Sequence, residues 1–221
     1  YQVLVTGGGT GVGMKNIAEG NSEIGMASRE VTSDEKSQVG DEIKENLIGY
    51  DGIVIGVSRE IYDSGVTTLS KDQVKAIYSG EIDNWEELSG PDEMILVVAR
   101  EQGSGTRDTF NEDVMGDKKA ETSGVSTVAG SNAEIRTALT GGDNAIGYLG
   151  FSYAEDGSIG AITLDGVNPT AETIKDGSYE LARKLYLYTF GAPKPGAQAF
   201  IDFMLGPEGQ KVAEEYGFVP L

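Results

Sequence analysis

Short apolar runs alternate with longer amphipathic stretches along this chain. The runs are too short for buried helices and are typical of buried strands. They predict strands at residues 3–5, 22–27, 53–57, 95–99, 145–149, 162–164 and 185–189. The amphipathic stretches carry apolar residues at helical spacing, as Val74, Ile77 and Tyr78 do behind the capping residue Ser70. This alternation predicts an α/β fold with mainly parallel sheets.

Helix start and stop signals place further helices between these strands. Gly20 would end a helix that begins near Met14, and Thr32 with Glu35 would cap a polar helix. Further helices are expected from about Arg107, from Asn132 to about Leu139, over 197–205 and from Pro207. No low-complexity linker divides the chain, so strands rather than a flexible tether would join any two lobes.

The charge of the chain excludes some partners. Its 221 residues carry a net charge of −19, and the sequence pI is about 4.2. A field of this sign repels nucleic acid and anionic membranes, so neither is expected as a partner. The plain interpretation of the acidity is a solvated surface. A small anion could still bind, but only through short-range hydrogen bonds and local dipoles.

The absence of two residue types narrows the chemistry. The chain has no His and no Cys. This excludes Ser-His-Asp catalysis and the usual zinc ligands. No apolar run approaches the roughly 18 residues that a membrane span needs. The chain begins at Tyr1 with no signal peptide, and we expect it to be a piece of a longer precursor.

Three loops share one design, in which Gly and Ser or Thr separate an expected strand from an expected helix. They are Gly9-Thr10-Gly11, Gly103-Ser104-Gly105-Thr106 and Gly130-Ser131-Asn132, with Ser28-Arg29 as a weaker fourth case. A helix N-terminus offers unpaired N–H groups and partial positive charge, glycine allows an anion to approach closely, and hydroxyls add donors. Arg100 could add a planar fork that matches two oxygens of a tetrahedral anion.

Simpler interpretations stand beside this one. Ser and Thr before helices are ordinary N-caps, and one such site alone would indicate nothing more. Residues 8–15 resemble a P-loop, but the pattern requires Gly-Lys-Ser/Thr where Met14-Lys15-Asn16 stands. No register of the dinucleotide fingerprint fits Gly7 to Gly13. Acidic pairs such as Asp34-Glu35 are typical of exposed helices rather than of metal sites.

Eight segments, spread over nearly the whole chain, form a recognisable series of motifs. The most specific is Val97-Val98-Ala99-Arg100-Glu101-Gln102-Gly103-Ser104-Gly105-Thr106. The others are Met26-Ala27-Ser28-Arg29, Ile77-Tyr78-Ser79-Gly80, Asn84-Trp85, Asn144-Ala145-Ile146-Gly147-Tyr148, Leu185-Tyr186-Leu187-Tyr188, Pro207-Glu208-Gly209-Gln210-Lys211 and Gly217-Phe218-Val219-Pro220-Leu221. In their order along the chain, these segments resemble the phosphate-binding proteins of ABC-type phosphate importers.

The resemblance implies a type II periplasmic-binding fold, in which two α/β lobes with mixed sheets and helices on both faces hold the ligand in a cleft. The lobes would be residues 1–58 with 185–221, and residues 59–184, with crossings at 53–57 and 185–189. It further implies no cofactor, no metal, no enzymatic activity, a monomer outside the cytoplasm, and a membrane permease as partner. The candidate phosphate ligands are Thr10, Ser28, Arg29, Arg100, Ser104, Gly105, Thr106 and Ser131.

Two departures from the family pattern bear on this expectation. Some members have Asp after the serine that matches Ser28, where it accepts a proton from phosphate and rejects sulfate. Arg29 stands there in this chain, as in another branch, so selectivity for phosphate over sulfate stays open. Members also carry a strand, a Ser/Thr-rich loop and a helix before the segment that starts at Tyr1.

Two other kinds of function remain alternatives. One is a phosphate-handling enzyme with Ser104 as the nucleophile, although no His or Cys could activate it. The other is a sensing or interaction module that kept the fold and lost or altered its ligand, with sulfate or another oxyanion possible.

Overall fold

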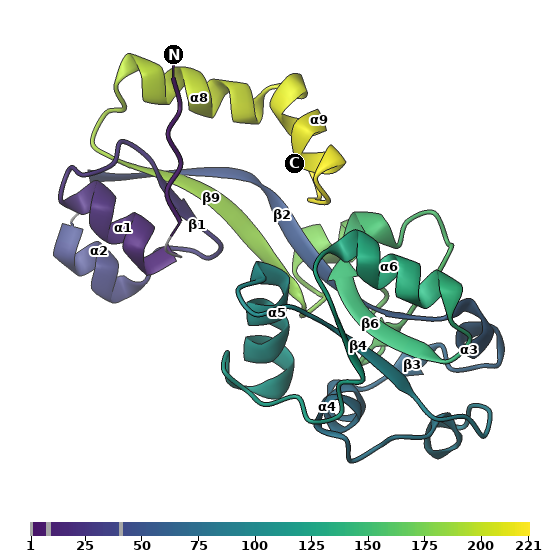
Figure 1. The fold of residues 1–221 in the computed structure, drawn as a ribbon. Coiled ribbons are helices and arrows are strands. Elements are labelled where there is room, and N and C mark those ends of the chain that lie inside the picture. Colours follow the sequence, from purple (N-terminus) through teal and green to yellow (C-terminus); the bar gives the residue numbers. More distant parts are fainter. Residues whose placement is uncertain (1, 8–9, 40–41) are drawn as a thin grey trace. The chain divides into compact units, whose positions relative to one another are not determined.

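The computed structural model describes residues 2–7, 10–39 and 42–221, shown in Figure 1. Within them, the helices are α1 (Thr10–Ala18), α2 (Ser33–Val39), α3 (Arg59–Asp63), α4 (Lys71–Ser79), α5 (Gly105–Phe110), α6 (Asn132–Gly141), α7 (Ala171–Asp176), α8 (Pro195–Leu205) and α9 (Pro207–Glu215). The strands are β1 (Gly25–Ala27), β2 (Ile43–Val57), β3 (Thr68–Leu69), β4 (Leu96–Arg100), β5 (Thr127–Ala129), β6 (Ala145–Gly150), β7 (Gly160–Ala161), β8 (Thr163–Leu164) and β9 (Ala182–Phe190).

The chain divides into two compact units. Unit 1 comprises Tyr1–Asp51 and Arg183–Leu221, and unit 2 comprises Gly52–Ala182. The chain passes from unit 1 into unit 2 within β2 and returns at the start of β9. The sequence places its expected lobe boundaries after Ser58 and after Lys184, and that division stays a prediction.

The sheet of unit 2 contains parallel and antiparallel pairs. The second half of β2 is followed by β6, β4 and β5, and β7 also pairs with β2. β4 lies parallel to both β5 and β6, whereas β2 pairs antiparallel with β6 and β7. The expectation of mainly parallel sheets is therefore wrong, and the mixed sheets that the family resemblance implies are present. Parallel pairing is concentrated where helices connect successive strands.

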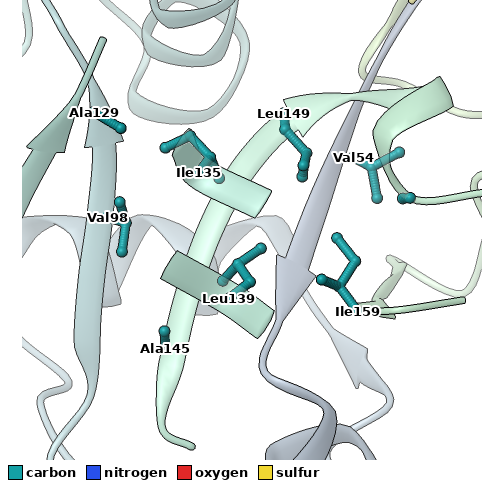
Figure 2. Packing of buried hydrophobic residues seen from close by; sticks show 9 residues of the cluster. Val54, Val98, Ala129, Ile135, Leu139, Ala145, Leu149 and Ile159 are labelled. Atoms are coloured by element: carbon teal, nitrogen blue, oxygen red, sulfur yellow. The ribbon is translucent and has the colours of Figure 1, made fainter. Parts of the chain in front are cut away.

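Helices cover both faces of this sheet. Ile135 and Leu139 of α6 pack against Val98, Ala145 and Leu149 in one apolar cluster, whose members Figure 2 shows. Val54, Ala129, Ala154 and Ile159 complete that cluster. Because side chains alternate along a strand, the intervening residues face the other way. There Tyr148 of β6 stacks on Phe110 of α5 with ring centroids 4.0 Å apart, and both rings contact Tyr78 of α4.

Helix ends follow the sequence signals closely. The expected helix behind Ser70 is confirmed as α4, because Ser70 Oγ accepts from Gln73 N at 3.1 Å and the Gln73 side chain accepts from Ser70 N at 2.8 Å. Gly80 then ends α4 in the left-handed region with φ 80°. The last two helices, α8 and α9, each begin with a proline at a first-turn position.

Unit 1 contains the sheet order β1-β9-β2, with β1 antiparallel to β9. Helix α1 packs so closely on β1 that the two backbones are in contact. A Cβ on Gly13 would lie 2.9 Å from the Met26 carbonyl oxygen, and one on Gly25 would lie 2.9 Å from the Gly13 oxygen. Only glycine fits at both contacts. This close approach brings the first residue of α1, Thr10, next to the chain that leaves β1.

The buried strand predicted at residues 3–5 is wrong. Val3, Leu4 and Val5 are 55%, 88% and 65% exposed. No ladder within the described part of the chain includes these residues, so apolar side chains alone do not make them a strand. The glycine loop that follows them is only partly covered, since Gly8 and Gly9 lie outside the described residues.

Candidate functional site

The loop that follows β4 in unit 2 carries most of the predicted site. Arg100 is the last residue of β4 and lies on the same face of the sheet as Val98, toward α6. Its Nη1 donates to Asn132 Oδ1, at the start of α6, at 2.7 Å. The residue is only 9% exposed. A guanidinium this buried needs partners for its N–H groups.

Glu101 is the main partner of the Arg100 guanidinium. Nε donates to Glu101 Oε2 at 2.9 Å, and Nη2 donates to Oε1 at 3.0 Å. The hydrogen bond from Arg100 lowers the pKa of Glu101 below its usual value. Arginine has five N–H groups, and three are used by Glu101 and Asn132. Among the described residues, one N–H on each terminal nitrogen is therefore left for a ligand.

Backbone contacts fix the end of β4. The Arg100 amide donates to the Tyr148 hydroxyl at 3.1 Å, and the Arg107 guanidinium donates to the Arg100 carbonyl at 2.9 Å. Burial raises the pKa of Tyr148, so this hydroxyl stays protonated. Arg107 brings a second positive charge to the same loop.

Ser104, Gly105 and Thr106 form the N-terminus of α5. The Ser104 side chain is buried, and its Oγ accepts from Arg107 N at 3.3 Å, which leaves its hydroxyl hydrogen free to donate. The first helical hydrogen bond runs from Asp108 N to Ser104 O at 2.9 Å. The amides of Gly105 and Thr106 precede it and are available to a ligand. A Cβ on Gly105 would meet no atom within 4 Å, so the space beside this amide is open.

The structure brings the Gly130-Ser131 loop next to this one. β4 and β5 are parallel with Arg100 opposite Ala129, and Glu101 N donates to the Ala129 carbonyl at 3.1 Å. Ser131 is the N-cap of α6 and accepts from Glu134 N at 3.1 Å. The Glu134 carboxylate in turn accepts from Gly130 N at 2.8 Å. The Gly130 amide, which the sequence pattern suggests as a donor to an anion, is thus already hydrogen-bonded to Glu134.

In unit 1 the structure brings Thr10 and Ser28 together. The Ser28 amide donates to Thr10 Oγ1 at 3.2 Å. The Ser28 hydroxyl oxygen accepts from Nη1 of Arg183 at 3.4 Å, and Nη2 of Arg183 donates to Asp51 Oδ2 at 2.9 Å. Both predicted hydroxyls therefore belong to one polar cluster.

Arg29 has a different set of contacts. Its two terminal nitrogens donate to the Glu35 carboxylate at 2.8 and 2.9 Å. Glu35 also accepts from the amide and the hydroxyl of Thr32 and so caps α2. The bond from Arg29 is the main cause that lowers the pKa of Glu35 to about 2. The fork of Arg29 thus holds the start of α2, and its role as a ligand stays a prediction.

Several residues that contact the candidate ligands were not themselves predicted as site residues from the sequence. Glu101, Asn132 and Arg107 lie within or beside the Gly-Ser loops, and their closeness in sequence to Arg100 and Ser131 is a signal that could have found them. Arg183 and Asp51 carry no such signal, because only the fold of unit 1 places them near Ser28.

Metal-binding clusters and membrane-spanning helices are both absent from the described residues. No group of His, Cys, Asp and Glu in that part of the chain could hold a metal ion. No helix there is long and apolar enough to cross a membrane.

Comparison with known proteins places the chain in a family. Residues 1–208 match the PBP superfamily domain. The phosphate-binding protein PstS of Bacillus subtilis is 33% identical over an alignment of 222 residues, which covers 99% of this chain and 71% of that protein. The PstS of Staphylococcus saprophyticus is 34% identical over an alignment of 230 residues, which covers 96% of this chain and 69% of that protein.

Solved structures agree with the sequence relatives. A candidate phosphate ABC transporter substrate-binding protein from Clostridium perfringens, with bound phosphate, is 39% identical with a TM-score of 0.69. The alignment covers 96% of this chain and 85% of that one. An ABC-type phosphate transport receptor from Vibrio cholerae is 29% identical with a TM-score of 0.77, covering 97% and 86%.

The mixed α/β units and their donor-rich loops define a solute-binding protein of the type II periplasmic-binding fold. This confirms the fold class expected from the resemblance. The chain belongs to the PBP superfamily and, within it, to the family of the phosphate-binding protein PstS.

Proposed function

We propose that this chain captures inorganic phosphate for an ABC-type importer and performs no chemistry on it. The observation that carries the proposal is the loop from Arg100 to Thr106. It presents two N–H groups of a buried guanidinium, the Ser104 hydroxyl and the amides of Gly105 and Thr106 within one short segment. These groups are all donors, which is what an oxyanion requires.

The strength of these donors can offset the charge of the chain. Each hydrogen bond to a charged group contributes about 1.5–3 kcal/mol net. Several such bonds suffice for micromolar or tighter binding once the costs of association are subtracted. Arg100 and Arg107 supply local positive charge in a chain whose net charge is −19. Phosphate binding therefore does not require long-range electrostatic attraction between the anion and the chain as a whole.

The same proposal assigns the remaining candidates. Thr10 and Ser28 of unit 1 would serve as further hydroxyl donors, and Ser131 would add a donor beside the Arg100 loop. Arg29 would act only if it left Glu35. Relatives named as phosphate-binding proteins, and a similar structure with bound phosphate, support phosphate as the ligand.

The proposal also covers the cellular location of the chain and its protein partner. Similar structures named as a phosphate ABC transporter substrate-binding protein and as an ABC-type phosphate transport receptor support a chain that delivers phosphate to the permease subunits of an importer. The proposal places the chain outside the cytoplasm, as a monomer. An enzymatic role has little support. The described contact of Ser104 Oγ is the Arg107 amide, which donates to it and cannot remove its proton.

A thermal shift on adding phosphate tests the proposal. A ligand that binds only the folded state stabilises it by about 2.7 kcal/mol at a hundredfold excess over Kd. For a chain of this size the melting temperature should then rise by roughly 5–11 °C. Sodium chloride at equal ionic strength is the control, and sulfate measures selectivity. An unchanged melting temperature in phosphate would contradict the proposal.

A further inference from the structure

Arg183 is a charged residue of unit 1 whose contacts the proposed function does not yet use. It lies in β9, and its side chain is 28% exposed. It reaches two other segments of unit 1, namely Ser28 after β1 and Asp51 in β2. Neither the charge pattern nor the motifs of the sequence indicate this arrangement.

Two hydroxyl oxygens in the cluster around Arg183 each accept a hydrogen bond. The Ser28 oxygen accepts from Arg183 Nη1, and the Thr10 oxygen accepts from the Ser28 amide. A hydroxyl has one hydrogen and two lone pairs, so an oxygen that accepts one hydrogen bond can still turn its hydrogen toward another group. Thr10 and Ser28 are therefore prepared to donate, which is the arrangement that an oxyanion needs.

The guanidinium of Arg183 is itself incompletely bonded. Its Nε atom is buried and has no hydrogen-bond partner among the described residues. Within the described part of the chain, Nη1 makes one hydrogen bond, the long 3.4 Å contact to Ser28 Oγ. A buried N–H without an acceptor costs free energy, and an anion that reached it would remove that cost. Asp51 holds Nη2 at 2.9 Å and so fixes the side chain.

We propose that Arg183 serves the candidate phosphate ligands of unit 1, where it orients the Ser28 hydroxyl and adds positive charge for the anion. The proposal rests on the proposed function, because it assumes that Ser28 binds phosphate. It also explains how unit 1 could bind an anion while the guanidinium of Arg29 is held by Glu35.

A purely structural role for Arg183 makes a different prediction. Its pair with Asp51 links β2 to β9, and this could be its whole purpose. In that case Asp51→Asn and Arg183→Gln would lower the melting temperature alike, and phosphate affinity would follow stability. If Arg183 acts on the ligand, Asp51→Asn should leave affinity unchanged or improve it, whereas Arg183→Gln should weaken it.

The experiment is calorimetric titration of inorganic phosphate into the wild-type chain and its variants, with the ligand-free melting temperature of each. We expect Arg183→Gln to weaken binding roughly tenfold to a hundredfold, which is the loss of one charged hydrogen bond. Lys184→Gln is the matched control, since it removes the same charge at the next residue, an exposed lysine that contacts Glu30. It should bind as the wild type does.

A double-mutant comparison tests whether Arg183 acts through Ser28. In the Ser28→Ala background, Arg183→Gln should cost much less than it does alone. If Arg183→Gln does not fold, Arg183→Lys takes its place. It retains a charge for Asp51 and should melt like the wild type, yet lose about tenfold in affinity because it lacks the fork.

The outcomes separate the two proposals. A wild-type chain that binds no phosphate overturns the proposed function and this inference with it. A wild-type chain that binds, together with an Arg183→Gln variant of equal affinity, overturns the inference alone. Equal weakening by Asp51→Asn and Arg183→Gln, in step with their melting temperatures, also overturns it.

Discussion

Replacing Arg100 by alanine should remove much of the phosphate affinity and little of the fold. The guanidinium keeps two N–H groups for a ligand, one on each terminal nitrogen, after Glu101 and Asn132 have taken three. Two charged hydrogen bonds contribute about 3–6 kcal/mol, so Kd should rise roughly 10²- to 10⁴-fold. The upper part of this range is favoured because Glu101 would lose its counter-ion and repel the anion.

The ligand-free protein should lose less. Arg100→Ala removes three side-chain hydrogen bonds, but the Glu101 side chain is 39% exposed and can be solvated instead. We expect a loss of about 1–2 kcal/mol, which lowers the melting temperature by roughly 2–8 °C. Affinity and stability should therefore change by clearly different amounts.

Calorimetric titration with phosphate and a thermal melt of the ligand-free variant measure the two effects. Arg136→Ala is the control, because it removes the same charge from unit 2 at an exposed arginine of α6 that pairs with Asp156. It should bind phosphate as the wild type does. A change in Kd of less than about threefold for Arg100→Ala would refute the reasoning, since it would mean that neither free N–H group reaches the ligand.

Three further predictions concern the fold around the site. Leu139→Ala empties part of the α6 cluster and should cost about 2–5 kcal/mol in urea unfolding; a loss below about 1 kcal/mol would show a looser core. Glu35 has a folded pKa of about 2 against 4.5 unfolded, so its pair with Arg29 stabilises the protein above pH 4.5. That stabilisation, on the order of 1–3 kcal/mol, should be lost as the pH falls from 4.5 toward 2, and Glu35→Gln should abolish this part of the acid dependence. Gly13→Ala places a Cβ 2.9 Å from the Met26 carbonyl and should lower the melting temperature by several degrees, and an unchanged value would mean that α1 can shift without cost.

Local signals in the sequence predicted much of the fold because they act through neighbouring residues. Ser70 at the start of α4 and Pro207 at the start of α9 each specify a helix end through local backbone geometry. Strand residues in unit 2 were recognisable because both faces of that sheet are covered, which leaves continuous apolar runs.

The predictions that failed concern strand formation and strand pairing, which depend on residues far away in the sequence. Residues 3–5 have the composition of a strand, but strand formation requires a neighbouring strand that composition does not reveal. The antiparallel pairing of β2 with β6 joins residues about 90 positions apart, and no local pattern specifies it.

The candidate site shows the same division. Arg100, Ser104, Gly105 and Thr106 lie in one continuous segment, so their order along the chain is enough to group them. Glu101 follows Arg100 directly in the sequence, so it could have been predicted as the partner of Arg100 in the same way. Arg183 was not, because it lies 155 residues from Ser28 and meets it only through the sheet of unit 1.

The most direct test is a crystal structure of the chain grown with inorganic phosphate. If hydrogen bonds from the loop after β4 hold the ion, its oxygens should lie about 3 Å from Ser104 Oγ, from the Gly105 amide and from a terminal nitrogen of Arg100. A phosphate ion bound elsewhere, or density that leaves these three donors without an anion at saturating phosphate, would contradict the account.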